Sequence, residues 1–255
     1  MARVKPVSHD EQLTLVDHLD ELRSRLIVSL FAFVVAFGIC GWQNNRILEI
    51  VNKPLPDRYD QPLTFGVTEP FTTTFTNAAY AALLLALPVI LYQVYAFVLP
   101  AFSPSEKRVA KPLMLMSPVL FIAGVVFCYF VVLPPATDFL LNFNASEFNT
   151  QVRARDYYSF STMTMLAMGL GFQVPIGIIA LVRLNIVSVE QLRHNRRYAI
   201  LAIAVLAALL PTIDPVTMLL EMVPLLILYE LSIVLAAALG RSPRESAEVA
   251  AVEGS

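Results

Sequence analysis

Charged residues are scarce in this sequence. Only 15% of its 255 residues are Asp, Glu, Lys or Arg, and 57% are hydrophobic, whereas a soluble domain carries roughly 25% charged residues. This balance argues against a single water-soluble globule. The charges nearly cancel to a net charge of −2, so no basic field favours nucleic acid as a partner.

Cysteine and histidine are scarce as well, with two and three copies. Cys40 and Cys128 lie within apolar runs and the histidines are scattered, so the sequence predicts no metal site and no redox motif. We interpret both cysteines as small buried hydrophobic residues. The motifs Gly-x-x-x-x-Gly-Lys, His-Glu-x-x-His and Gly-x-Ser-x-Gly are absent from the sequence. We therefore expect no catalytic residue and no cofactor.

Long apolar runs, in contrast, make up 122 of the 255 residues. Four of the six runs are 22 to 24 residues long, and a helix needs roughly 20 residues to cross the hydrocarbon core of a membrane. The first run, of 17 residues, is at the lower limit, and the fifth, of 13, is too short for a full crossing. The runs are Leu26–Trp42, Ala78–Leu99, Pro112–Pro134, Phe160–Val182, Tyr198–Leu210 and Val216–Leu239. The sequence thus predicts an all-α integral membrane protein with six transmembrane helices.

The short fifth run affects the helix that follows it. At 1.5 Å per residue it rises only ~20 Å, so the turn from Pro211 to Pro215 is expected below the membrane surface, where backbone must be covered or line a wet cavity. The sixth helix would then regain the other surface near Tyr229. We therefore expect both the fifth and sixth helices to be short. A tilted sixth helix is the alternative, because apolar residues continue to Leu239.

Basic residues are distributed unevenly over the loops. With six spans, 13 of the 18 Lys and Arg residues fall on the side of the two chain ends, and 5 on the other. The positive-inside rule places both termini in the cytoplasm, with the spans in the cytoplasmic (inner) membrane. We expect a cytoplasmic N-terminal segment with an amphipathic helix, a six-span membrane domain and a disordered cytoplasmic tail. Their bounds are 1–25, 26–239 and 240–255.

An amphipathic block precedes the first run. At 100° per residue, Leu15, Leu19, Leu22 and Leu26 form one apolar stripe, beside a polar row of His18, Glu21 and Arg25. The pattern predicts a short helix on the cytoplasmic surface, from which the chain turns into the bilayer. Two roles stay open for Glu21, which can pair with Arg25 four residues later or act as a functional carboxylate.

Several sequence blocks, in this order and spacing, resemble the TatC family, the multispanning subunit of the twin-arginine protein translocase. The resemblance covers residues 14–238. Its blocks are His18-Leu19-Asp20-Glu21-Leu22-Arg23-Ser24-Arg25-Leu26, Thr68-Glu69-Pro70-Phe71, Tyr92-Gln93 with Phe97, Glu106, Phe127-Cys128-Tyr129-Phe130-Val131-Val132-Leu133-Pro134, Phe172-Gln173-Val174-Pro175, Arg196-Arg197-Tyr198 and Glu230.

The resemblance implies a six-span fold with both ends in the cytoplasm, in agreement with the charge count. It implies a receptor for signal peptides with consecutive arginines, and the core of a translocase that exports folded proteins by means of the proton-motive force. The implied partners are single-span proteins of the TatA and TatB type, twin-arginine precursor proteins and the lipid bilayer. Further copies of the chain are expected in the complex, as a homo-oligomer.

The signal-binding residues implied by the resemblance are Glu21 and Glu106. Their chemistry suits the role, because two guanidinium groups require carboxylates that accept paired hydrogen bonds. His18, Arg23, Gln93 and Phe97 belong to the same sequence blocks. For these four, signal binding and a structural role in orienting helix ends or packing both stay open.

Three residues are candidates for docking a partner helix inside the membrane: Gln173, Asp214 and Glu221. The family usually has a glutamate where this chain has Gln173, while Glu221 stands where small or apolar residues are usual. By depth, Gln173 and Glu221 are expected at the same level of the membrane. Our hypothesis is that Glu221 supplies the missing acid to a polar concavity between the fourth and sixth helices; a purely structural, protonated Glu221 is the alternative.

Two other functions were weighed. A small-solute secondary transporter would use buried polar residues to line a solute path, but no matching pair of interrupted helices occurs in the two halves. An intramembrane enzyme lacks support because the catalytic motifs named above are absent.

Overall fold

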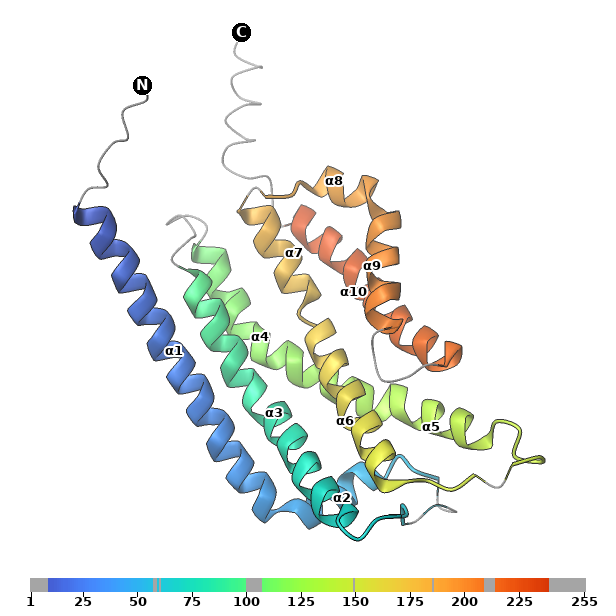
Figure 1. The fold of residues 1–255 in the computed structure, drawn as a ribbon. Helices are drawn as coiled ribbons and strands as arrows, with labels where there is room; N and C mark the ends of the chain where they lie inside the picture. Colours follow the sequence, from blue (N-terminus) through green and yellow to red (C-terminus); the bar gives the residue numbers. More distant parts are fainter. Residues whose placement is uncertain are drawn as a thin grey trace, which may run out of the picture.

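The computed structural model describes residues 9–56, 59, 61–99, 107–148, 150–184, 186–208 and 214–238. Glu106 and the expected tail at 240–255 lie outside the described residues. In chain order the helices are α1 (His9–Trp42), α2 (Asn44–Asn52), α3 (Glu69–Val98), α4 (Lys107–Phe127), the π-helix η3 (Cys128–Val132), α5 (Leu133–Asn142), α6 (Ala154–Gly171), α7 (Val174–Arg183), α8 (Val189–His194), α9 (Arg196–Ala208) and α10 (Pro215–Ala238). Figure 1 shows long helices side by side, with α2 at one end of the bundle and α8 at the other.

Five segments are long and apolar enough to cross a membrane. They are His18–Trp42, Glu69–Val98, Ala110–Asn142, Ala154–Arg183 and Pro215–Ala238. Each overlaps one of the apolar runs. The remaining run corresponds to α9, which has 13 residues and is short, as expected. The chain is therefore an all-α, multi-pass membrane protein.

The N-terminal amphipathic block is not a separate surface helix. α1 continues for 34 residues, and no turn separates the block from the first span. The reason lies in the sequence, since no proline or glycine occurs between His9 and Phe37 to interrupt the helix.

The expectation of a short sixth helix is wrong. α10 has 24 residues, which corresponds to ~36 Å. This helix is long enough to cross the ~30 Å hydrocarbon core, although α9 before it is short. In Figure 1, α10 is inclined to α9, and the neighbouring ends of both helices lie well short of the level of α2. The tilted alternative therefore describes α10, and α9 still ends within the depth of the bundle.

Small residues bring α1 and α3 together. Ala36 and Cys40 of α1 form a buried cluster with Ala78, Ala82 and Ala86 of α3. Small side chains permit this close approach in a membrane, where packing rather than the hydrophobic effect drives helix association. The interpretation of Cys40 and Cys128 as buried residues is confirmed. Many large apolar side chains, including Phe31 and Phe130, face outward instead, as expected for a surface in contact with lipid.

Prolines shape the third and fourth spans. The π-helix η3 ends at Val132, two residues before Pro134 and Pro135. The missing N–H groups of these prolines disturb the α-helical hydrogen-bond register. The fourth span is interrupted between α6 and α7, immediately before Pro175. Gln173 lies at this interruption as the N-cap residue of α7.

A close helix crossing joins α4 and α6. A Cβ atom placed on Gly124 of α4 would lie 2.9 Å from the Cα atom of Gly169 and 2.9 Å from the carbonyl oxygen of Met168. A Cβ atom on Gly169 would lie 2.6 Å from the ring of Phe121. Glycine is required at this crossing because the two backbones leave no room for a side chain.

Candidate functional site

Five side chains meet near the end of the bundle at which α1 begins and α3 ends. We call them the His18 cluster, defined by His18, Glu21 and Arg25 of α1 and Gln93 and Phe97 of α3. Spacings of three and four residues put the α1 members on one helix face, and the same spacing aligns the α3 members. Packing of α1 along α3 then brings the two faces together.

Arg25 is the centre of the polar contacts in this cluster. Its Nε atom donates to Oε1 of Glu21 at 2.9 Å, and its Nη1 atom donates to Oε1 of Gln93 at 3.1 Å. The Nδ1 atom of His18 lies 3.7 Å from Oε2 of Glu21. Arg25 thus bonds a carboxylate of its own helix and an amide of α3, and the bond to the amide links the two helices.

An aromatic contact closes the cluster on its other side. The rings of His18 and Phe97 are stacked, with centroids 4.3 Å apart and planes inclined by 12°. The Glu21 side chain keeps 33% of its surface exposed. Because Oε1 accepts from Arg25 and Oε2 has only the longer approach of His18, the carboxylate can accept a further donor from solvent.

The structure therefore brings together four of the predicted signal-binding residues: His18, Glu21, Gln93 and Phe97. Arg23 is exposed and makes none of these contacts. Glu106 cannot be placed because it lies outside the described residues, although α4 begins at the next residue, Lys107. Sequence reasoning treated Arg25 only as a partner of Glu21, and its additional contact with Gln93 has no signal in the sequence.

The predicted intramembrane residues are not joined to one another by hydrogen bonds in the described part of the chain. The amide of Gln173 is bonded to Ser117 of α4, accepting from Oγ at 2.7 Å and donating to the carbonyl at 3.2 Å. Glu221 is fully buried, at 0% exposure, and neither carboxyl oxygen has a hydrogen-bond partner among the described residues. The expected open concavity shared by Gln173 and Glu221 is therefore not supported by their contacts.

Asp214 has a structural contact at the start of α10. Its Oδ1 atom accepts the backbone N–H of Thr217 at 2.7 Å, and Pro215 is the first residue of the helix. This arrangement is an N-cap followed by proline, which satisfies a free N–H group at the helix start.

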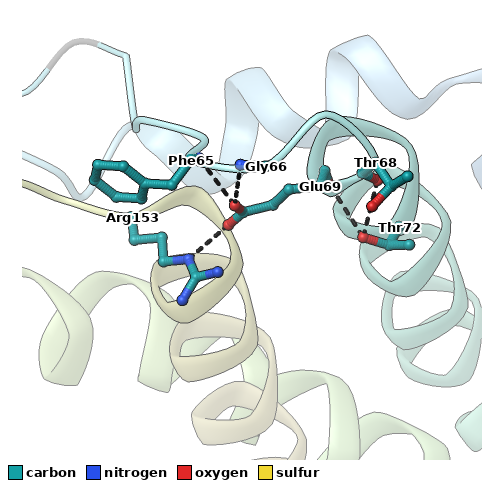
Figure 2. A network of polar contacts seen from close by, with 6 residues as sticks. All are labelled: Phe65, Gly66, Thr68, Glu69, Thr72 and Arg153. Atoms are coloured by element: carbon teal, nitrogen blue, oxygen red, sulfur yellow. Dashed lines mark hydrogen bonds and ion pairs between the residues drawn. The ribbon is translucent and has the colours of Figure 1, made fainter.

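A second polar network lies at the opposite end of the bundle, near α2 (Figure 2). Glu69, at the start of α3 and 6% exposed, accepts the backbone N–H groups of Phe65 and Gly66. It also accepts Nε of Arg153 at 2.6 Å, and this hydrogen bond raises the pKa of Arg153. Next to this network, the Leu63 N–H group donates to the carbonyl oxygen of residue 152, and the N–H group of residue 154 donates to the carbonyl oxygen of Leu63. We call this set of contacts the Glu69 seam; it joins two loops far apart in the sequence.

Comparisons with known proteins agree with the resemblance drawn from the sequence. Residues 17–224 match the family described as Sec-independent protein translocase protein (TatC). A TatC protein from Carboxydothermus hydrogenoformans is 36% identical over 228 residues, covering 89% of this chain and 94% of the relative. The TatC protein of Aquifex aeolicus is 35% identical over 237 residues, covering 91% of this chain and 98% of the relative.

Solved structures are similar as well. A crystal structure described as twin arginine translocase receptor TatC, in the detergent DDM, superposes with a TM-score of 0.77 at 36% identity. The match covers 86% of this chain and 99% of that chain. None of these relatives favours a solute transporter or an intramembrane enzyme. The chain belongs to the TatC family and is a multi-pass membrane subunit of a twin-arginine, Sec-independent protein translocase.

Proposed function

We propose that this subunit is the receptor for twin-arginine signal peptides and the core of the translocase, exporting folded proteins across the cytoplasmic membrane by means of the proton-motive force. The observation that supports the receptor role is the His18 cluster. It gathers a partly exposed carboxylate, an amide and an aromatic ring on two adjacent helices. These groups match a guanidinium, which forms paired hydrogen bonds with carboxylates and stacks on rings.

Arg25 suggests how the signal peptide is received. A guanidinium already lies on Oε1 of Glu21, so the cluster is formed around the chemical group that it has to recognise. We propose that one signal arginine approaches Oε2 of Glu21 and that Glu106 accepts the neighbouring arginine. Arg23 would contribute from the exposed face of α1 at the same level.

The receptor role is tested by binding. The purified complex should bind a precursor with two consecutive arginines at least tenfold more tightly than the same precursor with two lysines, because lysine lacks the planar pair of donors. Fluorescence anisotropy of a labelled precursor measures both affinities. Equal affinities for the two precursors would refute recognition of the guanidinium pair.

The proposed orientation places both termini and the His18 cluster in the cytoplasm. We expect single cysteines at Gln61 and Glu147, which are exposed near the α2 end, to react with an impermeant thiol reagent on intact cells. A cysteine at Glu190, exposed in α8, should react only after lysis. The native cysteines are buried and give little background. Labelling of Glu190→Cys on intact cells would contradict this orientation and place the α8 end of the bundle outside the cytoplasm.

We further propose that single-span TatA- and TatB-type proteins dock within the membrane near Gln173, Asp214 and Glu221, in a complex with several copies of this chain. The buried, unpartnered carboxyl of Glu221 supports this proposal. A polar group left unpaired at such depth is costly, and a polar residue of a partner helix would satisfy it.

Glu221→Ala should reduce export of a twin-arginine reporter by up to about tenfold, since a hydrogen bond contributes roughly 0.5–1.5 kcal/mol and each 1.4 kcal/mol is a factor of ten. Adding Gln173→Glu should restore export, because the acid then stands where the family usually has it. Immunoblotting of the membrane fraction verifies equal protein levels. Full export by Glu221→Ala alone, or no recovery in the double variant, contradicts the compensation.

A further inference from the structure

A polar pocket of about 410 Å³ lies between the first turns of α3 and α6. The pocket lies near the Glu69 seam, because Thr68 and Thr72 of its lining flank Glu69. Both α3 and α6 begin at the end of the bundle opposite the start of α1 (Figure 1). Its volume is within the range of roughly 300–1,000 Å³ typical of small-molecule sites. The proposed receptor function makes no use of this pocket.

Two buried side chains that line the pocket have unpaired polar atoms. Asn77 is 1% exposed, and neither its amide nitrogen nor its amide oxygen has a hydrogen-bond partner among the described residues. Thr73, one turn earlier and 7% exposed, has an unpaired hydroxyl. Buried polar groups in proteins are normally satisfied, so these atoms indicate a ligand with hydrogen-bonding oxygens.

The charge of the pocket indicates the sign of that ligand. Arg155 is the one ionised residue of its lining, which contains no carboxylate. In the described part of the chain no hydrogen bond or ion pair joins the Arg155 guanidinium, whereas the nearby Glu69 is bonded to Arg153. Hydroxyl groups of Thr76 and Ser159 add further donors. One guanidinium surrounded by hydroxyl and amide donors suits an anionic group with several oxygens.

The position of the pocket indicates which anion is available. Asn77 and Ser159, both in the pocket lining, directly precede the apolar runs that begin at Ala78 and Phe160. They therefore lie at the boundary between the polar loops and the hydrocarbon core, where lipid headgroups are found. Basic pockets between transmembrane helices are known to bind lipid headgroups on the cytoplasmic side, and the same chemistry applies to this pocket at the opposite end of the bundle.

We propose that this pocket binds a phosphate group, supplied by the headgroup of an anionic phospholipid. Arg155 provides the charge, and the amide of Asn77 and the hydroxyl of Thr73 bond the phosphate oxygens. A lipid held in this way would fill the gap between α3 and α6.

The test uses the full-length protein in detergent, delipidated and then incubated with phosphatidylglycerol, diacylglycerol or inorganic phosphate. Native mass spectrometry counts bound lipid, and isothermal titration calorimetry measures inorganic phosphate. We expect a phosphatidylglycerol adduct and no diacylglycerol adduct. Arg155→Gln should weaken the adduct by about tenfold, because a charge-assisted hydrogen bond is lost. Asn77→Asp, nearly identical in shape but negative, should also weaken it.

Arg46→Gln is the matched control, since Arg46 is an exposed arginine of α2 outside the pocket lining, and it should bind lipid like the wild type. Two results together would overturn the proposal of a bound lipid: tight binding of inorganic phosphate by the wild type, and an unchanged phosphatidylglycerol adduct in Arg155→Gln. The pocket would then be a site for a free anion. Equal adducts of phosphatidylglycerol and diacylglycerol would overturn phosphate recognition altogether. All these readouts are independent of precursor binding.

Discussion

The Glu21→Gln, Glu106→Gln double variant should bind a twin-arginine precursor about a hundredfold more weakly than the wild type, at an unchanged protein level. Glutamine preserves the shape of each side chain but removes the charge. A hydrogen bond to a charged group contributes roughly 1.5–3 kcal/mol, and each 1.4 kcal/mol is a factor of ten in affinity. Each single variant should therefore lose about tenfold, and fluorescence anisotropy of a labelled precursor measures the three affinities.

Asp20→Asn is the matched control, because Asp20 is an exposed carboxylate directly adjacent to Glu21. If binding depended only on negative charge at this end of the protein, Asp20→Asn would weaken it as much as Glu21→Gln. We expect wild-type affinity for Asp20→Asn, because Asp20 is not among the residues in contact in the His18 cluster. Wild-type affinity in the double variant would remove both glutamates from the signal site.

Gly124→Ala should destabilise the protein strongly for so small a change. The added Cβ atom would meet the Cα atom of Gly169 and the carbonyl oxygen of Met168, both at 2.9 Å. These are backbone atoms, so α4 and α6 have to move apart. Overpacking of this kind costs typically ~1–3 kcal/mol. The measurement is the apparent melting temperature of the purified protein in detergent, together with its level in the membrane.

Gly177→Ala provides the control in the fourth span, which also contains Gly169. A Cβ atom on Gly177 would meet nothing within 4 Å, and alanine is favoured over glycine within a helix by about 0.5–1 kcal/mol. The two substitutions should therefore act in opposite directions, with Gly177→Ala neutral or slightly stabilising. Similar losses in both variants would contradict an essential crossing at Gly124.

The spans could be predicted from the sequence because each depends on a local property, the length of an apolar run. Ala78–Leu99 falls almost entirely within α3, and Tyr198–Leu210 overlaps α9. The prediction of a short sixth helix was wrong because the length of one apolar run was used to infer the depth and length of the next helix. The depth arithmetic for the sixth helix assumed that it stands upright, but tilt is set by packing against neighbouring helices.

In the candidate site, too, the features within one helix were predictable from the sequence and the contacts between helices were not. His18, Glu21 and Arg25 follow helical spacing, so their common face was predictable. Contacts between segments distant in the sequence were not, since the helix packing that creates them leaves no local pattern. The bond of Gln173 to Ser117, 56 residues away, and that of Arg25 to Gln93, 68 residues away, are of this kind.

The continuity of α1 also has a mechanical consequence. A helix of 34 residues is ~51 Å long, considerably longer than the ~30 Å thickness of the hydrocarbon core. His18 and Glu21 are consequently fixed to the same rigid rod that packs against α3 within the membrane, with no hinge between. A tilt of ~10° about the far end would displace the start of this rod by ~9 Å. Any force on the His18 end of α1 is thus transmitted directly to the interface of Ala36 and Cys40 with α3.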